Sequence, residues 1–129
     1  MSSLTRAEEA HLSRAVKVAG QSTCRQMHGS VLAIGRRVLA VGVNSFRSHP
    51  MHVTDPKREA SFHAEVAVLR QLNYDVHDGR SVLFVARVNR LGGPMLSMPC
   101  PQCRIAIARA GVGKCVFTGI EGGFGVYEV

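Results

Sequence analysis

The stretch VLFVARVNRLGGPMLSMPCPQCRIAIARAGVGKCVFT, residues 82–118, decides the fold of this 129-residue chain. It begins with an apolar, β-branched run, Val82 to Val88, which is typical of a strand. After a break that contains glycine and proline, Pro101 to about Ala110 predicts a helix that Gly111 closes. Lys114 to Thr118 predicts the next strand. Because a strand–helix–strand unit needs a crossover helix, we expect parallel pairing at the sheet centre.

The residues near the N-terminus predict a helix and a hairpin. Thr5 and Glu8 fit a capping box, and apolar residues then recur at helical spacing to about Gly20. Ser30 to Ile34 and Val38 to Val43 are short β-branched runs on either side of a Gly-Arg-Arg turn. This pattern indicates a β-hairpin.

A long polar segment and a second predicted helix lie between the hairpin and the stretch of residues 82–118. Asn44 to Ala60 contains two prolines and predicts a long loop, and loops of this length are often functional. From Ser61, an N-cap candidate, apolar residues up to Leu72 predict a largely buried helix, which forms a second crossover unit. At the other end of the chain, Gly119 to Phe124 is too short for a crossover. Gly125 to Val129 should therefore pair antiparallel with the strand before it.

The elements follow one another in the order α-β-β-α-β-α-β-β. We predict an α/β fold, a three-layer α/β/α sandwich whose five-stranded mixed sheet ends in two antiparallel strands. A chain of this length fits one domain, so we assign residues 1–129 to a single domain.

Composition narrows the class of protein. Hydrophobic residues make up 46% of the chain and charged residues 19%, which is typical of a globular domain. No stretch approaches the roughly 18 to 20 apolar residues that span a bilayer, and Met1 to Ala10 lacks the apolar core of an export signal. We therefore expect a cytoplasmic protein without a membrane partner, whose four cysteines are thiols or metal ligands.

The charge balance is strongly basic, with 16 Lys and Arg against 9 Asp and Glu and a net charge of +7. Such an excess attracts phosphates, whether on free nucleotides or on a nucleic-acid backbone. A solvated basic surface is the alternative interpretation.

Two short motifs carry the chemistry: His63-Ala64-Glu65 and Pro99-Cys100-Pro101-Gln102-Cys103. The two cysteines share one face of the first turn of a helix, where the helix dipole favours thiolates. If both helix starts converge, one imidazole and two thiolates meet and leave a fourth tetrahedral position open for water, as catalytic zinc requires. The predicted zinc ligands are His63, Cys100 and Cys103.

This combination of motifs resembles the zinc-dependent cytidine and deoxycytidylate deaminase superfamily, and the resemblance runs from Gly29 to Gly111. It implies the cytidine-deaminase-like sandwich, one Zn²⁺ per chain and self-association as a homo-oligomer. It also implies that zinc lowers the pKa of a bound water toward about 7 and that Glu65 carries protons from the water to the base and the leaving amine. By the same resemblance, the Ala64 backbone amide binds the base carbonyl and Asn44 binds the sugar.

Other interpretations of the same residues stay open. His49 and His52 with the two motif cysteines would make a closed structural zinc shell. Alternatively, the cysteines are a buried or redox pair. We expect no chemical role for His11, His28 and His77, and we expect Cys24 and Cys115 to be small buried thiols rather than metal ligands.

The substrate is predicted less directly than the chemistry. We rank a free cytosine nucleoside or nucleotide first. Arg47, Lys57 and Arg58 are candidate contacts for a 5′-phosphate, and cations of a solvated loop are the alternative interpretation. Cytosine in single-stranded DNA or RNA is the alternative, favoured by the positive charge but opposed by the scarcity of aromatic residues. The tRNA adenosine deaminases carry Glu where this chain has Met98, which opposes that third substrate. A non-catalytic zinc-stabilised binding module is the last alternative.

Overall fold

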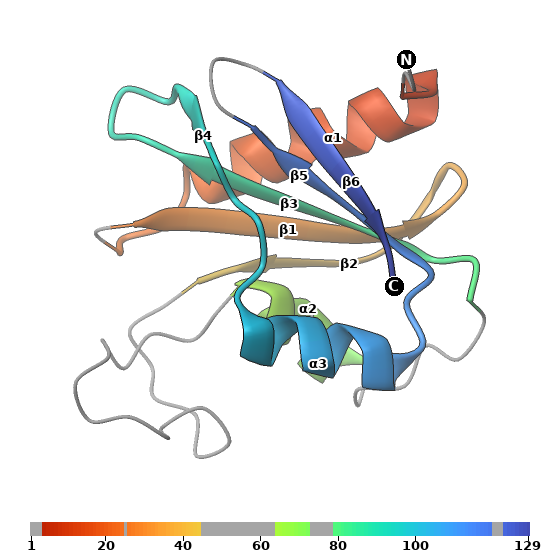
Figure 1. Cartoon of the computed structure of the whole chain (residues 1–129). Coiled ribbons are helices and arrows are strands. Elements are labelled where there is room, and N and C mark those ends of the chain that lie inside the picture. Colours follow the sequence, from red (N-terminus) through yellow and green to blue (C-terminus); the bar gives the residue numbers. More distant parts are fainter. Residues whose placement is uncertain (1–3, 25, 45–63, 73–78, 120–122) are drawn as a thin grey trace.

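The computed structural model describes residues 4–24, 26–44, 64–72, 79–119 and 123–129. They form three layers, in which a central sheet has helices on both faces (Figure 1). Helix α1 (Arg6–Ala19) covers one face, and α2 (Ala64–Gln71) and α3 (Pro101–Ala110) cover the other. The predicted three-layer α/β/α sandwich is confirmed.

The sheet has the strand order β2-β1-β3-β5-β6, and a short β4 pairs with β3 beside this path. Pairing is antiparallel throughout except between β3 and β5, which are parallel. The strands are β1 (Met27–Ile34), β2 (Arg37–Val43), β3 (Val82–Val88), β4 (Pro94–Met95), β5 (Lys114–Thr118) and β6 (Phe124–Glu128).

The stretch from β3 to β5 folds as expected. The predicted bounds of β3, α3 and β5 match the observed ones, and Gly111 ends α3 in the left-handed conformation with φ of 91°. The antiparallel pairing of β5 with β6 is also confirmed. Strand β4 was not predicted, because a two-residue strand that begins with proline carries no alternating pattern.

The expectation of parallel pairing around α2 is wrong. Helix α2 connects β2 to β3, but β1 lies between these strands and pairs antiparallel with both. The reason lies in the burial of β1, which is buried from Gly29 to Ala33 and so takes a central place in the sheet.

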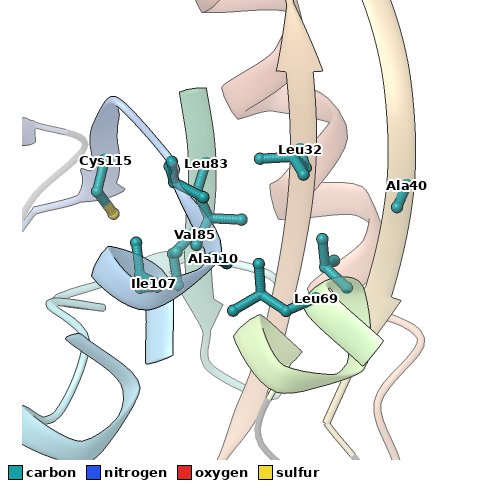
Figure 2. Close-up of a cluster of buried hydrophobic side chains, with 10 residues drawn as sticks. Leu32, Ala40, Leu69, Leu83, Val85, Ile107, Ala110 and Cys115 are labelled. Atoms are coloured by element: carbon teal, nitrogen blue, oxygen red, sulfur yellow. The ribbon is translucent and has the colours of Figure 1, made fainter. Parts of the chain in front are cut away.

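Each face of the sheet has its own hydrophobic core. Ala15 and Ala19 of α1 pack on Val31 and Phe84 on one face. On the other face, the side chains between the sheet and its two helices form the cluster in Figure 2, which includes Leu32, Leu69, Leu83, Val85, Ile107, Ala110 and Cys115. Both helices of this second face begin at the end of the sheet where β3 ends, which brings their N-termini together.

Helix α1 is fixed at its start as the sequence predicted. Thr5 and Glu8 form the capping box, and the second carboxylate oxygen of Glu8 lies 2.6 Å from Nζ of Lys114 on β5. The described residues contain no helix that is long and apolar enough to cross a membrane.

Candidate metal and catalytic site

The start of α2 is held against the sheet by two neighbouring residues. Ser30 Oγ on β1 donates a hydrogen bond of 2.7 Å to the carbonyl of Ala64. Its cross-strand partner Gly42 lets the helix approach, because a Cβ there would lie 2.9 Å from the same carbonyl oxygen. These contacts place Ala64, which is fully buried, and Glu65, which is only 4% exposed, at the inner end of the helix.

The start of α3 carries the two motif cysteines. Cys100 is the N-cap residue with an extended backbone, and Pro101 follows it in the first turn. Cys103 is fully buried and packs with Val66 of α2, in a small cluster that Cys100 joins. The two helix starts therefore meet.

A buried hydroxyl pair fixes the chain just before Cys100. Ser97 Oγ donates to the carbonyl of Val85 at 2.8 Å and accepts a bond of 2.9 Å from the backbone amide of Thr118. Thr118 Oγ1 donates to the carbonyl of Met95 at 2.6 Å. This network ties the segment before α3 to β3 and β5, so the position of Cys100 is set by the sheet.

Glu65, Cys100 and Cys103 come together between the two helix starts. The Cys103 side chain is hydrogen-bonded to those of Cys100 and Glu65. The bond with Cys100, burial and the Glu65 charge all raise the pKa of the Cys103 thiol. Two ionised sulfurs with a carboxylate nearby would concentrate negative charge, and a cation held by the sulfurs would favour the thiolates. The chemistry of these donors fits zinc.

The third predicted zinc ligand, His63, lies outside the described residues. In the part of the chain that the structure describes, no three His, Cys, Asp or Glu side chains are arranged to hold a metal ion. The rival ligands and the predicted phosphate-contacting cations also lie outside that part; these are His49, His52, Arg47, Lys57 and Arg58.

Asn44 lies at the end of β2, where its side chain joins three segments. Its Oδ1 accepts hydrogen bonds from Ser22 Oγ at 2.6 Å and from the His28 amide at 3.0 Å. Its Nδ2 donates to the carbonyl of Gln26 at 2.6 Å. Both lone pairs of Oδ1 are thus used within the protein, and a contact with a sugar would have to come from the second N–H of the amide.

Cys115 on β5 and Tyr127 on β6 lie near enough to Glu65 to interact with its charge. Cys115 is fully buried, and burial together with the charge of Glu65 raises the pKa of its thiol. Tyr127 lies opposite Cys115 in the strand register, and the Arg104 guanidinium covers its ring at 4.9 Å. Cys115 and Cys24 are buried thiols, as expected from the sequence.

Sequence reasoning missed the residues that position the motifs. Ser30 and Thr118 are polar residues in otherwise largely apolar strands, and Ser97 precedes the Met-Pro-Cys run. A buried hydroxyl in a strand is a weak signal, because its partner is a backbone carbonyl that has no sequence signature.

The sequence matches the protein family described as the cytidine and deoxycytidylate deaminase zinc-binding region, over residues 5–119. A search of curated proteins gave no significant match.

Solved structures of deaminases share the fold. The apo dCMP deaminase from the cyanophage S-TIM5 is 28% identical, with a TM-score of 0.63 over 88% of this chain and 84% of that one. The same enzyme in complex with dCMP and dUMP gives 24% identity and a TM-score of 0.62 over 92% and 85% of the two chains. The cytidine deaminase from Burkholderia pseudomallei is 18% identical, with a TM-score of 0.67 over 97% and 93%.

The family match covers most of the chain and includes both motifs. The chain therefore belongs to the cytidine and deoxycytidylate deaminase family, whose defining region binds zinc.

Proposed function

We propose that this protein is a zinc-dependent hydrolytic deaminase that converts cytosine to uracil in free cytidine or deoxycytidine nucleosides or nucleotides and releases ammonia. The observation that carries the proposal is the contact of the buried Glu65 carboxylate with Cys103, at the meeting point of two helix starts. A carboxylate buried beside two thiols is costly unless a charge partner or a chemical task accompanies it.

The residues that would hold the zinc are Cys100, Cys103 and His63. When bound there, zinc would supply a Lewis acid that activates a water molecule for attack on the ring carbon that bears the amine. Three protein ligands leave room for that water.

Glu65 would move the protons. Its carboxylate accepts a proton from the attacking water, delivers it to the neighbouring ring nitrogen and later helps the amine leave as ammonia. Its burial at 4% exposure keeps bulk water away from this exchange. Helix packing fixes its direction, since the next residue, Val66, is fully buried against Cys103.

The base would be held at the start of α2. Amides in the first turn of a helix have no partner within the helix, and the Ala64 amide is in that position. We assign it to the base carbonyl. Asn44 would offer its remaining amide proton to the sugar.

Free nucleotides are the favoured substrates because the cyanophage relative is a dCMP deaminase that was solved with dCMP and dUMP. Cytosine in single-stranded DNA or RNA is the second candidate, favoured by the net charge of +7 and the exposed ring of Phe124. Tyr127 is a poor stacking platform, since Arg104 covers its ring. The adenosine of tRNA ranks below both, because Met98 replaces the Glu of those enzymes. A non-catalytic zinc module ranks last. We further propose a cytoplasmic homo-oligomer.

The test is a substrate panel with matched variants. Wild type, Glu65→Gln and the surface control Glu128→Gln are incubated with cytidine, deoxycytidine, deoxycytidylate, a cytosine-containing oligonucleotide and tRNA. Products are identified by mass spectrometry, and zinc is quantified in each protein. Turnover of a free nucleoside or nucleotide that is lost in Glu65→Gln alone, with zinc retained, supports the proposal. Turnover that survives in Glu65→Gln contradicts it.

A further inference from the structure

Arg87 and His28 form a cross-strand pair at the end of the sheet where the two helices begin. They are directly opposite each other in the antiparallel register of β3 and β1. Gly29 with Ala86 is the next pair inward, and Ser30 with Val85 follows it. Because directly opposed residues point to the same side of a sheet and alternate residues share a face, the four side chains of the first and third pairs lie on one face.

That face is the one that carries the catalytic groups. Ser30 reaches the Ala64 carbonyl on α2, and Val85 packs in the core beneath α2 and α3. Two residues along a strand cover roughly 7 Å. The Arg87–His28 pair therefore lies about one step beyond the start of α2. This step leads to the carboxyl end of β3, where ligands bind in open α/β sheets.

The backbone around the pair is firmly held. The Arg87 amide donates to Thr118 Oγ1 at 3.2 Å, within the hydroxyl network that positions Cys100. The backbone amide of His28 donates to Asn44 Oδ1, and the backbone amide of Asn44 donates to the His28 carbonyl. Both side chains thus stand on backbone that is shared with the candidate site.

The charge of Arg87 is not neutralised by the described residues. Arg87 is only partly exposed, and no carboxylate in the described part of the chain forms an ion pair with it. A guanidinium presents a planar fork of donors that matches two oxygens of a phosphate, and a histidine beside it adds a further donor. From sequence we expected no role in chemistry for His28, and its place beside Arg87 changes that expectation.

We infer that Arg87, assisted by His28, is a specificity-determining residue that binds a phosphate attached to the sugar of the cytosine substrate. This inference rests on the proposed function and narrows its substrate class to phosphorylated substrates. The phosphate is either the terminal 5′-phosphate of a free nucleotide or a phosphodiester of a polynucleotide, and the same guanidinium chemistry recognises both.

The test compares removal of an arginine charge at position 87 with removal of an arginine charge at position 90. Arg87→Gln and Arg87→Lys are measured beside Arg90→Gln, which removes an exposed arginine three residues further along the chain. The readout is the ratio of kcat/KM for deoxycytidylate to kcat/KM for deoxycytidine, with a cytosine-containing oligonucleotide as a third substrate. A second readout that needs no turnover is the affinity for dUMP relative to deoxyuridine, by calorimetry.

The expected result is that Arg87→Gln lowers the nucleotide-to-nucleoside ratio roughly ten- to a hundredfold, since a charge-assisted hydrogen bond is lost. Arg87→Lys should lose less of the ratio, and Arg90→Gln should keep it. A drop confined to the oligonucleotide identifies a phosphodiester as the ligand, whereas a drop for deoxycytidylate identifies a terminal phosphate.

An unchanged ratio and unchanged relative dUMP affinity in Arg87→Gln would overturn the inference while leaving deamination intact. A wild-type protein that turns over none of the substrates would instead refute the proposed function, and the dUMP measurement would still report on Arg87. A variant that unfolds is detected by its circular dichroism, and Arg87→Lys then decides the outcome.

Discussion

Ser30 Oγ and the carbonyl of Ala64 are joined by a buried hydrogen bond of 2.7 Å that links β1 to the first turn of α2. Ala64 directly precedes Glu65, so this bond helps to set the position of the Glu65 carboxylate above the sheet. Because a hydroxyl on β1 holds the first carbonyl of α2, the sheet helps to determine where α2 begins.

Replacement of Ser30 by alanine should destabilise the protein by about 1–2 kcal/mol, because the buried Ala64 carbonyl loses its side-chain donor. Turnover should fall further than stability alone explains, since Glu65 is no longer held in place. Urea denaturation and steady-state kinetics measure the two effects. Ser13→Ala, an exposed change on α1, is the control and should alter neither. An active, fully stable Ser30→Ala protein would contradict this role.

Gly42 and Gly29 permit close helix approach on opposite faces of the sheet. Alanine variants at these two positions therefore distinguish an effect on packing from an effect on turnover. A Cβ at Gly42 would lie 2.9 Å from both the Ala64 oxygen and Val68 Cγ2, whereas at Gly29 it would lie 2.3 Å from the Ala19 amide of α1. Both alanine variants should lose roughly 1–3 kcal/mol of stability by overpacking. Only Gly42→Ala should also lower kcat at a temperature where both variants are folded. Equal loss of kcat in the two variants would show that α2 has no special position.

The Ser97–Thr118 network should matter for metal affinity as well as stability. Thr118→Val keeps the shape of the side chain but removes the partner of the Met95 carbonyl and the Arg87 amide. We expect a loss of about 1–3 kcal/mol and a zinc affinity that is roughly tenfold weaker, as for other groups that orient ligands. Competition with a chromophoric chelator measures the affinity. The control is the exposed change Thr23→Val, which should leave the zinc affinity unaltered. An unaltered zinc affinity in Thr118→Val would show that the network does not position Cys100.

The ion pair of Glu8 with Lys114 predicts a pH-dependent part of the stability. Burial alone would raise the pKa of Glu8, but the hydrogen bonds and charge of Lys114 and the capping bonds of Thr5 together lower it. A lowered pKa in the folded state means that the stabilisation is present above the unfolded pKa and disappears as pH falls through the folded pKa.

Glu8→Gln removes this charge and retains a residue type that serves in a capping box. It should cost up to about 1 kcal/mol near pH 7, and the difference from wild type should shrink as pH falls below 4. Thermal unfolding across this pH range measures it. Glu9→Gln, at an exposed position of the same turn, is the control. A Glu8→Gln deficit that is constant with pH would contradict the ion-pair account.

Local sequence patterns predicted the bounds of most helices and strands, whereas the order of the strands in the sheet depends on long-range pairing. The bounds of β3, α3 and β5 were predictable because Gly111 and the β-branched runs are local signals. The insertion of β1 between β2 and β3 was not, because strand order depends on which strand is buried on both faces. The motif around Cys100 was visible in sequence, whereas the hydroxyl partners Ser97 and Thr118 were not, since their acceptors are backbone carbonyls.

The central claim is tested most directly by metal analysis of purified wild type, Cys103→Ser and Cys115→Ala. Cys103 belongs to the predicted ligand set, and Cys115 is an equally buried thiol on β5 outside it. The account predicts about one zinc per chain in wild type and in Cys115→Ala, and loss of zinc in Cys103→Ser. Full zinc content in folded Cys103→Ser, or a wild-type protein that fails to bind zinc, would contradict it.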